Sequence, residues 1–221
     1  MEPERPEAAR DRLVDDLVAA GRLSDERVAR AMRAVPRHEF VPQAVCDHAY
    51  EDRPLRIGRE QVITAPHLVA QMAELLDLRP GQTVLEVGTG SGYHAAVIAE
   101  IVGPGNVLTI ERFPDLAASA RAALDRTGYG EVTVLVGDGS RGLPCHPPFD
   151  RIDVTAVAPT VPVPLVDQLA DDGLMVLPLG PRDGPHELVV LTKRAGRVER
   201  TSHGGVRFVP LVGEHGFEAG G

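Results

Sequence analysis

The chain has 221 residues, of which 43% are hydrophobic, a size and composition that suit one α/β domain with a substantial buried core. Its formal net charge of −9 argues against nonspecific binding to nucleic acid or to an anionic membrane, for which a basic face is expected. No apolar run approaches the roughly 20 residues that span a bilayer, and the first residues carry no signal-peptide pattern, so we expect a cytoplasmic protein.

The first 55 residues predict helices. Leu13, Leu17 and Val18 recur as if on one helical face, and Ser24 is a suitable N-cap for a second helix. We expect residues 1–55 to form a helical cap that packs beside a sheet and helps to cover a ligand there. A purely structural cap is the alternative interpretation.

A polar loop is expected over residues 51–64, and a helix over residues 68–76. Pro66 is a good start signal for this helix, because proline is favoured at the first helical position. Thr64 and His67 therefore lie at a helix N-terminus, where free amide groups attract anions.

The most informative segment is residues 83–92, in which a short apolar strand containing Glu86 leads into a glycine-rich turn. Three glycines occupy alternate positions of the turn: Gly88, Gly90 and Gly92. Glycine lets the backbone turn tightly and lets a ligand approach closely. The helical pattern of residues 93–102 follows at once, so its free amide groups point back toward the same crevice.

Acidic residues follow the next two strands as well. Glu111 ends the strand predicted at residues 106–110, about 20 residues past the glycines, where an acid commonly bonds the two ribose hydroxyls of a nucleotide. After the helix of residues 115–127, a strand at residues 132–136 leads to Asp138 and Gly139. Each acid alone has an ordinary alternative as a helix cap, but acids at three successive strand ends favour a nucleotide pocket.

The spacing and charge of the turn indicate which nucleotide binds. Dinucleotide sites usually read G-x-G-x-x-G, whereas this turn reads G-x-G-x-G and has Glu86 two residues before its first glycine. A carboxylate there disfavours a pyrophosphate but tolerates a cation. S-adenosyl-L-methionine carries a sulfonium, an ammonium and no phosphate, so electrostatics favour it. The strand, turn and helix resemble the first motif of Rossmann-like methyltransferases.

The remaining elements are a strand at residues 150–157, a proline-rich turn, a short helix at residues 165–169 and a strand at residues 174–179. Residues 187–193 and 206–211 are predicted to form an antiparallel hairpin. Strands that alternate with helices predict a mostly parallel sheet, with this hairpin at its edge. We expect a single domain over residues 1–221, with the cap at 1–55, a cofactor-binding core at 56–181, and the edge hairpin with a substrate-lining C-terminus at 182–221.

Cysteine and histidine spacing gives no metal signature. Cys46 and Cys145 are too far apart for a C-x-x-C site, and the eight histidines form no H-x-x-x-H pair. We therefore expect neither a disulfide framework nor a metal.

Beyond the glycine turn, the chain resembles the protein-L-isoaspartate (D-aspartate) O-methyltransferase family from about Asp11 to Phe217. The Ala65-Pro66-His67 segment and the terminal Val209-Pro210-Leu211 are its most specific features, because the glycine turn is shared with many methyltransferases. The segments that carry the resemblance are 35–42, 49–52, 63–67, 137–140, 149–152, 158–159, 176–180 and 208–211.

The resemblance implies a Rossmann-like class I fold and methyl transfer from S-adenosyl-L-methionine to the side carboxylate of an L-isoaspartyl residue in a damaged protein or peptide. The ester then closes to a succinimide that reopens partly to aspartate, which repairs the chain. By position, the resemblance assigns a catalytic hydroxyl to Thr64. It assigns substrate contacts to Ala65, His67 and Val209, and cofactor contacts to Glu86, Gly88, Gly90, Gly92, Glu111, Asp138 and Gly139.

The departures from the family pattern cluster in residues 55–64. Arg56 stands where the family has proline, Glu60 where it has glycine, Val62 where it has threonine and Thr64 where it has serine. The change at position 60 alters both the permitted backbone angles and the local charge. Threonine keeps the hydroxyl of serine but restricts its rotamer.

This clustering leaves two methyltransferase interpretations open: general isoaspartyl repair, and a dedicated enzyme that methylates a normal aspartate in one partner peptide, such as a ribosomal natural-product precursor, to give an aspartimide or a methyl ester. Arg56 and Arg59 would then hold an acidic peptide, unless they are solvated loop charges.

An NAD-dependent oxidoreductase is disfavoured by the glycine spacing and by the lack of a Tyr-x-x-x-Lys pair. A non-catalytic peptide-binding module is disfavoured by the intact acids. We expect a monomer.

Overall fold

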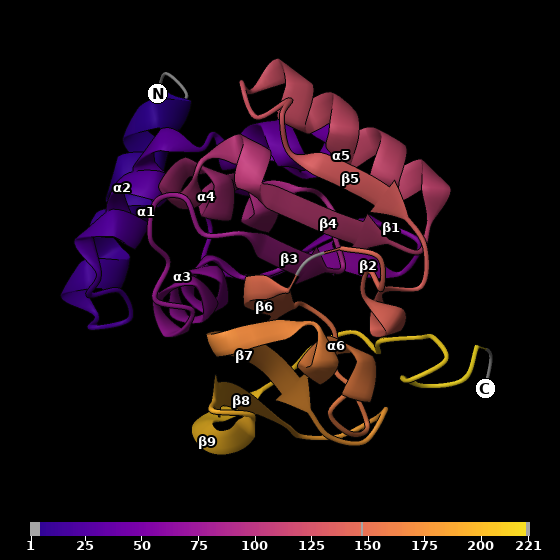
Figure 1. Ribbon diagram of the computed structural model, residues 1–221. Coiled ribbons are helices and arrows are strands. Elements are labelled where there is room, and N and C mark those ends of the chain that lie inside the picture. Colours follow the sequence, from indigo (N-terminus) through magenta and orange to yellow (C-terminus); the bar gives the residue numbers. More distant parts are fainter. Residues whose placement is uncertain (1–4, 147, 220–221) are drawn as a thin grey trace.

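The computed structural model describes residues 5–146 and 148–219 (Figure 1). The N-terminal residues 1–4, where no signal pattern is expected, lie outside the described residues. A seven-stranded sheet runs through the molecule in the order β5-β4-β3-β6-β7-β8-β9. Its strands are β3 (Val84–Val87), β4 (Val107–Glu111), β5 (Thr133–Val136), β6 (Phe149–Val154), β7 (Leu169–Leu179), β8 (His186–Arg194) and β9 (Arg197–Val206). Strands β3 to β7 are parallel and β8 and β9 are antiparallel, which confirms the expected sheet.

Six α-helices are described: α1 (Pro6–Ala19), α2 (Glu26–Ala34), α3 (Pro66–Leu75), α4 (Tyr93–Val102), α5 (Pro114–Arg126) and α6 (Val163–Asp167). Short 3₁₀ turns lie at η1 (Arg37–Phe40), η2 (Gln43–His48), η3 (Pro104–Asn106) and η4 (Gly139–Arg141). Proline occupies the first turn of α1, α3 and α5, where its missing amide is not needed. The bounds predicted for α4 are those observed.

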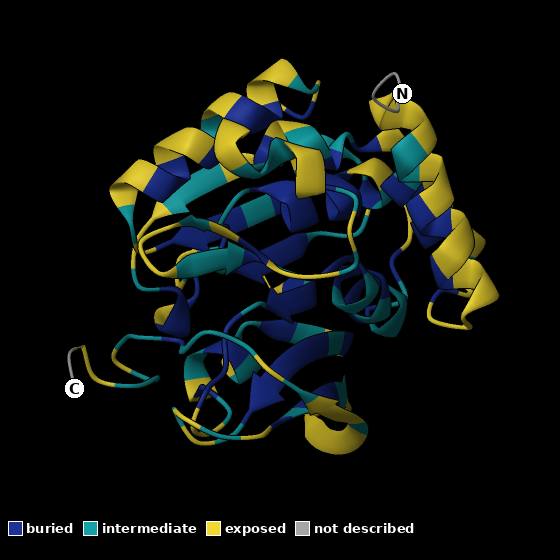
Figure 2. Cartoon of the chain, turned by 180° about the vertical axis from the view of Figure 1, so that it is seen from behind, coloured by how far each residue is buried: buried dark blue, intermediate teal, exposed yellow. Residues whose placement is uncertain are grey.

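Alternate residues of the central strand enter two different cores, because successive side chains of a strand point to opposite faces. Val84 packs with the layer that contains α1 to α4. Leu85 and Val87 pack with β6, β7 and α6 on the other face. Figure 2 shows buried residues along the strands and exposed residues on the outer sides of the helices.

Two details of the N-terminal helices differ from expectation. Leu13 and Leu17 are buried, but Val18 is 47% exposed, because a one-residue step on a helix turns the side chain by about 100°. The N-cap of α2 is Asp25 rather than Ser24, and the Asp25 side chain accepts a hydrogen bond from the Arg27 amide.

Two strand assignments were wrong. The segment expected as a polar loop contains an antiparallel hairpin of β1 (Leu55–Gly58) and β2 (Gln61–Ile63). The partner of β8 is β9, which ends at Val206, so the run expected as the last strand at residues 206–211 follows the hairpin instead. Strands β1 and β2 are short, and β9 is exposed on both faces. These strands therefore lack the apolar alternation that marks a half-buried strand.

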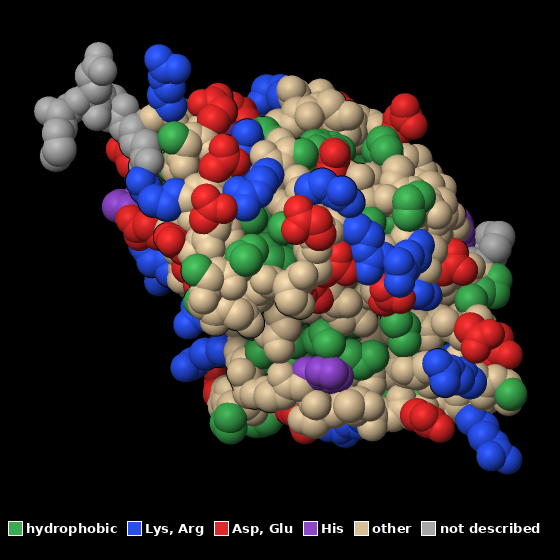
Figure 3. All heavy atoms as spheres, turned by 90° about the vertical axis from the view of Figure 1, so that its left-hand side faces the viewer, with side chains coloured by type: hydrophobic (Ala, Val, Ile, Leu, Met, Phe, Trp, Pro, Cys, Tyr) green, Lys and Arg blue, Asp and Glu red, His purple; other side chains and the backbone are tan. Residues whose placement is uncertain are grey.

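Among the described residues, no helix is both long and apolar enough to cross a bilayer. On the face seen in Figure 3, acidic and basic side chains are interspersed over the surface.

Candidate active site

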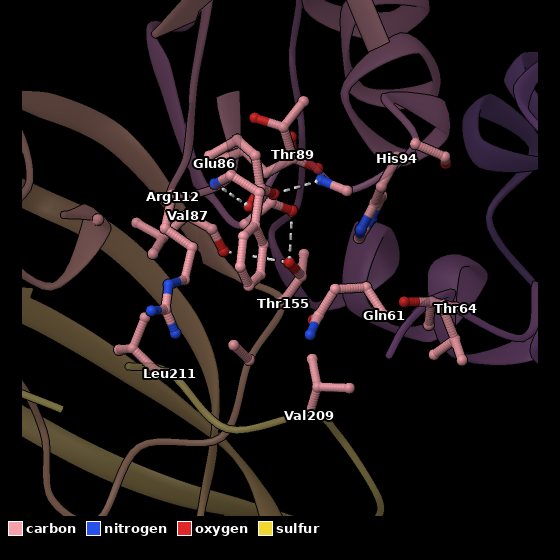
Figure 4. A pocket seen from close by; sticks show the side chains of 18 of the residues that line it. Gln61, Thr64, Glu86, Val87, Thr89, His94, Arg112, Thr155, Val209 and Leu211 are labelled. Carbon is pink, nitrogen blue, oxygen red and sulfur yellow. Dashed lines mark hydrogen bonds between the residues drawn. The ribbon is translucent and has the colours of Figure 1, made fainter. Parts of the chain in front are cut away.

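A cavity of about 300 Å³ opens at the carboxyl ends of β3 and β4 (Figure 4). The chain passes from β3 through β4 to β5 on one side of the sheet and then returns to β6 and β7 on the other, so the strand order reverses beside β3. A reversal of this kind leaves a crevice that commonly binds ligands in open α/β sheets. The cavity is thus where the glycine-rich turn predicts a ligand.

The glycine-rich turn lines this cavity and depends on glycine at its first position. Gly88 has φ of +100°, and a Cβ there would overlap the Thr155 hydroxyl. Gly90 and Gly92 also have positive φ, and Gly92 caps α4, where it packs against α5 rather than lining the cavity. Thr155 donates a 2.7 Å hydrogen bond from Oγ1 to the carbonyl oxygen of Gly88, which ties the turn to the end of β6.

Glu111 stabilises the same turn from the end of β4. Its Oε2 accepts a hydrogen bond from the Gly90 amide at 2.9 Å, and its Oε1 accepts one from the Phe113 amide at 3.0 Å. Both carboxylate oxygens keep further lone pairs, since each can accept more than one hydrogen bond. Glu111 lines the cavity, as the sequence predicts.

Glu86 lies beneath the turn and is fully buried. Its Oε2 accepts a 2.5 Å hydrogen bond from the Thr109 hydroxyl. Burial, and then repulsion from Asp153, raise the pKa of Glu86 well above its usual value. Burial also raises the pKa of Asp153 to about 8 and lowers the pKa of the neighbouring His94 to about 3.

Asp138 does not line the cavity, although Gly139 does. Its Oδ1 accepts hydrogen bonds from the amide and the hydroxyl of Ser140, and its Oδ2 accepts a 2.8 Å hydrogen bond from the Glu214 amide. Partial burial raises the pKa of Asp138, but these hydrogen bonds outweigh it and the net shift is downward. The carboxylate of Asp138 thus anchors the C-terminal segment against η4.

A second cavity of about 670 Å³ adjoins the first, beside the N-terminus of α3 and the segment that follows β9. Ala65 and His67 line it. The His67 ring is held by Asp52, whose Oδ1 lies 2.7 Å from Nδ1 and also accepts a hydrogen bond from the His67 amide. His67 therefore pairs with a side chain from the preceding loop rather than with the backbone of its own helix.

Four residues line both cavities: Val62, Thr64, Thr155 and Val209. Thr64 was expected near the reacting centre and Val209 in the substrate site, and Figure 4 shows them on the same side of the cavity as Gln61. Thr155 was missed. It comes directly after β6, so the rule that ligands meet the carboxyl ends of parallel strands could have found it.

The altered segment forms part of the wall of the first cavity. Arg59 and Glu60 make the tight turn between β1 and β2 with φ of +50° and +60°, and both line the cavity. Arg59 donates a 2.8 Å hydrogen bond to Asp115 on α5 and lies over the Phe113 ring. It is thus engaged in a contact within the protein, which joins the turn of the hairpin to the first turn of α5.

Comparison with known proteins points to one family. A family model described as Protein-L-isoaspartate(D-aspartate) O-methyltransferase (PCMT) matches residues 8–216. A Methanopyrus kandleri protein named Protein-L-isoaspartate O-methyltransferase is 56% identical over 212 residues, which cover 95% of this chain and 94% of the relative. A Hyperthermus butylicus protein of the same name is 54% identical over 218 residues, which cover 95% of this chain and 90% of the relative.

Solved structures agree with these relatives. A chain from Plasmodium falciparum, crystallised in complex with S-adenosyl-L-homocysteine, superposes with a TM-score of 0.83 at 26% identity, and the match covers 92% of this chain and 98% of that one. A second structure, named protein-L-isoaspartate O-methyltransferase, superposes with a TM-score of 0.83 at 28% identity, over 94% of this chain and 67% of that one.

Proposed function

This chain belongs to the protein-L-isoaspartate(D-aspartate) O-methyltransferase family, and we propose that it methylates the side carboxylate of L-isoaspartyl residues with S-adenosyl-L-methionine as the donor. One observation carries the proposal beyond family membership: two adjoining cavities share the walls formed by Val62, Thr64, Thr155 and Val209. A transfer between two bound molecules requires such a junction, because the donor carbon and the acceptor oxygen must come within about 3–3.5 Å.

The first cavity suits the methyl donor. The glycine turn lets the backbone approach a ligand closely, and the buried Glu86 and the Glu111 carboxylate supply acceptors without a phosphate cradle. Bound S-adenosyl-L-methionine supplies a methyl group on a sulfonium, which leaves as a neutral thioether. We propose that Glu111 bonds the ribose hydroxyls and that Gly88, Gly90 and Gly139 let the donor approach the backbone.

Two residues of the proposed donor site would act indirectly. Gly92 is the N-cap of α4 and so sets the direction of the free amide groups at the start of that helix. Asp138 would act through the C-terminal segment, which it bonds at Glu214, because that segment brings Leu211 to the wall of the first cavity. A direct contact of Asp138 with the donor would require its carboxylate to turn from these partners.

The second cavity suits the acceptor peptide. We propose that Ala65, His67 and Val209 line the isoaspartyl site, with His67 oriented by Asp52. No general base is needed, since a carboxylate of ordinary pKa near 4 is already ionised at pH 7. An oxygen of the acceptor carboxylate attacks the methyl carbon as the carbon–sulfur bond breaks, giving a methyl ester. The chain's task is to align the two groups and exclude water, and Thr64 is placed at the junction to orient that oxygen.

The remaining expectations form part of this proposal. We propose a single domain in which residues 1–55 cap the sheet, residues 56–181 hold the donor and residues 182–221 supply the edge hairpin and substrate contacts. We propose a cytoplasmic enzyme whose partner is a protein or peptide. The net charge of −9 disfavours nonspecific binding to nucleic acid or to an anionic membrane. We propose that it acts as a monomer.

Two matched peptides test the proposed function. They carry L-isoaspartate or L-aspartate at one position, and methyl transfer from labelled S-adenosyl-L-methionine is measured on each. Transfer to the isoaspartyl peptide alone is expected. The free carboxylate of isoaspartate branches from the peptide chain at a different position from that of aspartate, so only one of the two reaches the junction of the cavities in line with the donor. Equal transfer to both peptides, or transfer to the aspartyl peptide alone, would contradict general repair. Donor binding without transfer to either would indicate a dedicated partner peptide.

A further inference from the structure

Three titratable side chains that lie far apart in the sequence meet beneath the first cavity: Glu86, His94 and Asp153. Glu86 on β3 and Asp153 on β6 are paired in register on neighbouring parallel strands, so both side chains point to the same face of the sheet. His94, the second residue of α4, lies over that face. One ligand atom from each of the three lies within 4.8 Å of the other two.

These side chains hold most of the unpartnered buried polar atoms in the described part of the chain. Eight buried side-chain nitrogen and oxygen atoms there have no hydrogen-bond partner, and five of the eight belong to this cluster: Glu86 Oε1, His94 Nδ1, His94 Nε2, Asp153 Oδ1 and Asp153 Oδ2. His94 Nδ1 and Asp153 Oδ2 lie 3.1 Å apart without the geometry of a hydrogen bond. Unpartnered buried polar groups are costly, so a concentration of five indicates a missing partner.

The cluster contrasts with the other acids of the site. Both oxygens of Glu111 and both oxygens of Asp138 accept hydrogen bonds from backbone amides. No Lys or Arg of the described residues pairs with Asp153, whose two oxygens are free of hydrogen bonds, and Glu86 keeps one oxygen free. A divalent cation would neutralise two carboxylates and leave the imidazole uncharged.

We propose that Glu86, His94 and Asp153 form a binding site for one divalent transition-metal ion, of the class of Zn²⁺, Co²⁺ or Mn²⁺. Two carboxylates and an imidazole suit these ions better than Mg²⁺ or Ca²⁺, which prefer oxygen alone, or Cu⁺, which prefers sulfur. Donors about 2.1 Å from an ion at tetrahedral angles lie roughly 3.4 Å apart. His94 Nδ1 and Asp153 Oδ2 already lie 3.1 Å apart, and the widest separation in the cluster, which is within 4.8 Å, would close by at most about 1.4 Å.

The ion has an entry path and an open position. Glu86 and His94 both line the 300 Å³ cavity (Figure 4), whereas Asp153 is fully buried and does not line it. Three protein ligands leave at least one coordination position, which faces that cavity and can hold water. The three ligands stand eight and 59 positions apart in the sequence, so local spacing could not reveal the site, and the expectation of no metal came from local spacing alone.

Metal binding is measured directly, without methyl donor or peptide, so that its failure is separate from failure of the proposed transfer. The protein is freed of metal with a chelator, and Zn²⁺ is titrated in by calorimetry while Co²⁺ is followed by its visible absorption. We expect one ion per chain and a rise in Tm with bound metal. Absence of stoichiometric binding at micromolar Zn²⁺ would overturn the proposal and indicate that protons neutralise the cluster.

Two substitutions locate the ion. Asp153→Asn keeps the shape of the side chain, and His94→Gln keeps a polar group of similar reach. Both should weaken Zn²⁺ binding at least 100-fold and abolish the Co²⁺ absorption, with folding checked by circular dichroism. His48→Gln is the matched control, since His48 lies 2.6 Å from Glu51 as a surface histidine–carboxylate pair. Wild-type affinity in both cluster variants, or loss of binding in the control, would overturn the assignment.

Discussion

The guanidinium of Arg37 donates a 2.8 Å hydrogen bond from Nη2 to the carbonyl oxygen of Thr64, 27 residues further along the chain. Its Nε donates a second hydrogen bond, at 2.9 Å, to the carbonyl oxygen of Ala49, and its charge lies over the Tyr93 ring. Arg37 is fully buried, and burial lowers its pKa to about 10, so the side chain still carries its charge at neutral pH. One side chain thus fixes the backbone at the junction of the two cavities.

We expect Arg37→Lys to lower the free energy of unfolding by about 2–3 kcal/mol, because an ammonium cannot bond both carbonyl groups from one position and leaves a buried acceptor unpaired. Methyl transfer should also slow, since Thr64 loses its anchor. Urea denaturation and initial rates measure the two effects. Arg33→Lys is the control: Arg33 pairs with the exposed Asp15, and the change should cost less than about 0.5 kcal/mol. Equal stability of both variants would contradict the role given to Arg37.

Gly88→Ala should strongly destabilise the protein and abolish donor binding, for two separable reasons. An alanine there must adopt φ near +100°, and its Cβ overlaps the Thr155 hydroxyl. We expect unfolding free energy to fall by about 3 kcal/mol or more and binding of S-adenosyl-L-methionine, measured by calorimetry, to be lost. Gly128→Ala is the matched control, because Gly128 has φ of +90° with nothing within 4 Å of a Cβ, so it should cost only about 1–2 kcal/mol.

A double substitution separates the two reasons. Thr155→Ala removes the hydroxyl that the new Cβ would meet, so combining it with Gly88→Ala should recover part of the lost stability. The sum of the two single effects would then exceed the effect of the double variant. If the stability losses of the two single variants simply add in the double variant, the overlap with Thr155 does not contribute to the loss in Gly88→Ala.

The sequence predicted those elements in which the apolar pattern and the bounding residues reflect burial and element ends. Helix α4 is mostly apolar and is bounded by glycine at both ends, so both of its ends were predictable. Strand β9 was not, because its side chains are exposed on both faces and show no alternation. The β1–β2 hairpin was missed for a related reason: its turn uses Arg59 and Glu60, which carry no signal for positive φ.

The site was predictable only where a residue stands next to a motif. Thr64 and Val209 were found from the segments that contain them, and Glu111 from its place at a strand end. The cluster of His94 and Asp153 depends on which strands are neighbours and on their register. That information belongs to the packed sheet, since a shift of one residue would turn Asp153 to the opposite face.

Glu60→Gly should stabilise the protein. Glu60 has φ of +60°, which costs an L-residue roughly 1 kcal/mol, whereas glycine adopts this conformation freely. The greater entropy that glycine loses on folding offsets part of the gain, so we expect an increase of about 0.5 kcal/mol in the free energy of unfolding measured by urea denaturation. Glu199→Gly, in strand β9, is the control and should destabilise. A loss of stability at position 60 as large as at position 199 would refute strain in the hairpin.

Asp52→Asn should make stability depend less on pH. Partial burial raises the pKa of Asp52, but its hydrogen bonds with His67 and Arg22 outweigh this, so the folded-state pKa is lower than the ordinary value of 3.8. The carboxylate therefore stabilises the fold above about pH 4, and this contribution is lost as pH falls through the folded-state pKa. We expect the variant to be less stable than wild type by about 1 kcal/mol at pH 7, with the difference shrinking below pH 4.

Urea denaturation at pH 7 and at pH 3 measures this difference. Asp15→Asn is the control, since the Asp15 side chain is 70% exposed and its pair with Arg33 should contribute little at either pH. A difference between wild type and Asp52→Asn that stays constant with pH would show that the charge of Asp52 is not involved.

Thr64→Val tests the hydroxyl at the junction of the two cavities. Valine keeps the branched shape of threonine and removes only the hydrogen-bonding group, so packing around the hairpin should be preserved. If Thr64 orients the acceptor carboxylate, the loss of one hydrogen bond to a charged group, about 1.5–3 kcal/mol, should lower kcat/KM by roughly 10- to 100-fold. Thr64→Ser restores the hydroxyl and should stay within a few-fold of wild type.

Rates on an isoaspartyl peptide at saturating donor, together with donor affinity from calorimetry, separate the effects of Thr64 on the two ligands. Donor affinity should change little in either variant, because the turn and Glu111 are untouched. Thr201→Val, on the exposed strand β9, controls for the chemistry of the substitution and should leave kcat/KM unchanged. Wild-type rates in Thr64→Val would show that the hydroxyl has no role in methyl transfer. Thr64 would then serve only as part of the cavity wall, held in place by the hydrogen bond from Arg37 to its carbonyl oxygen.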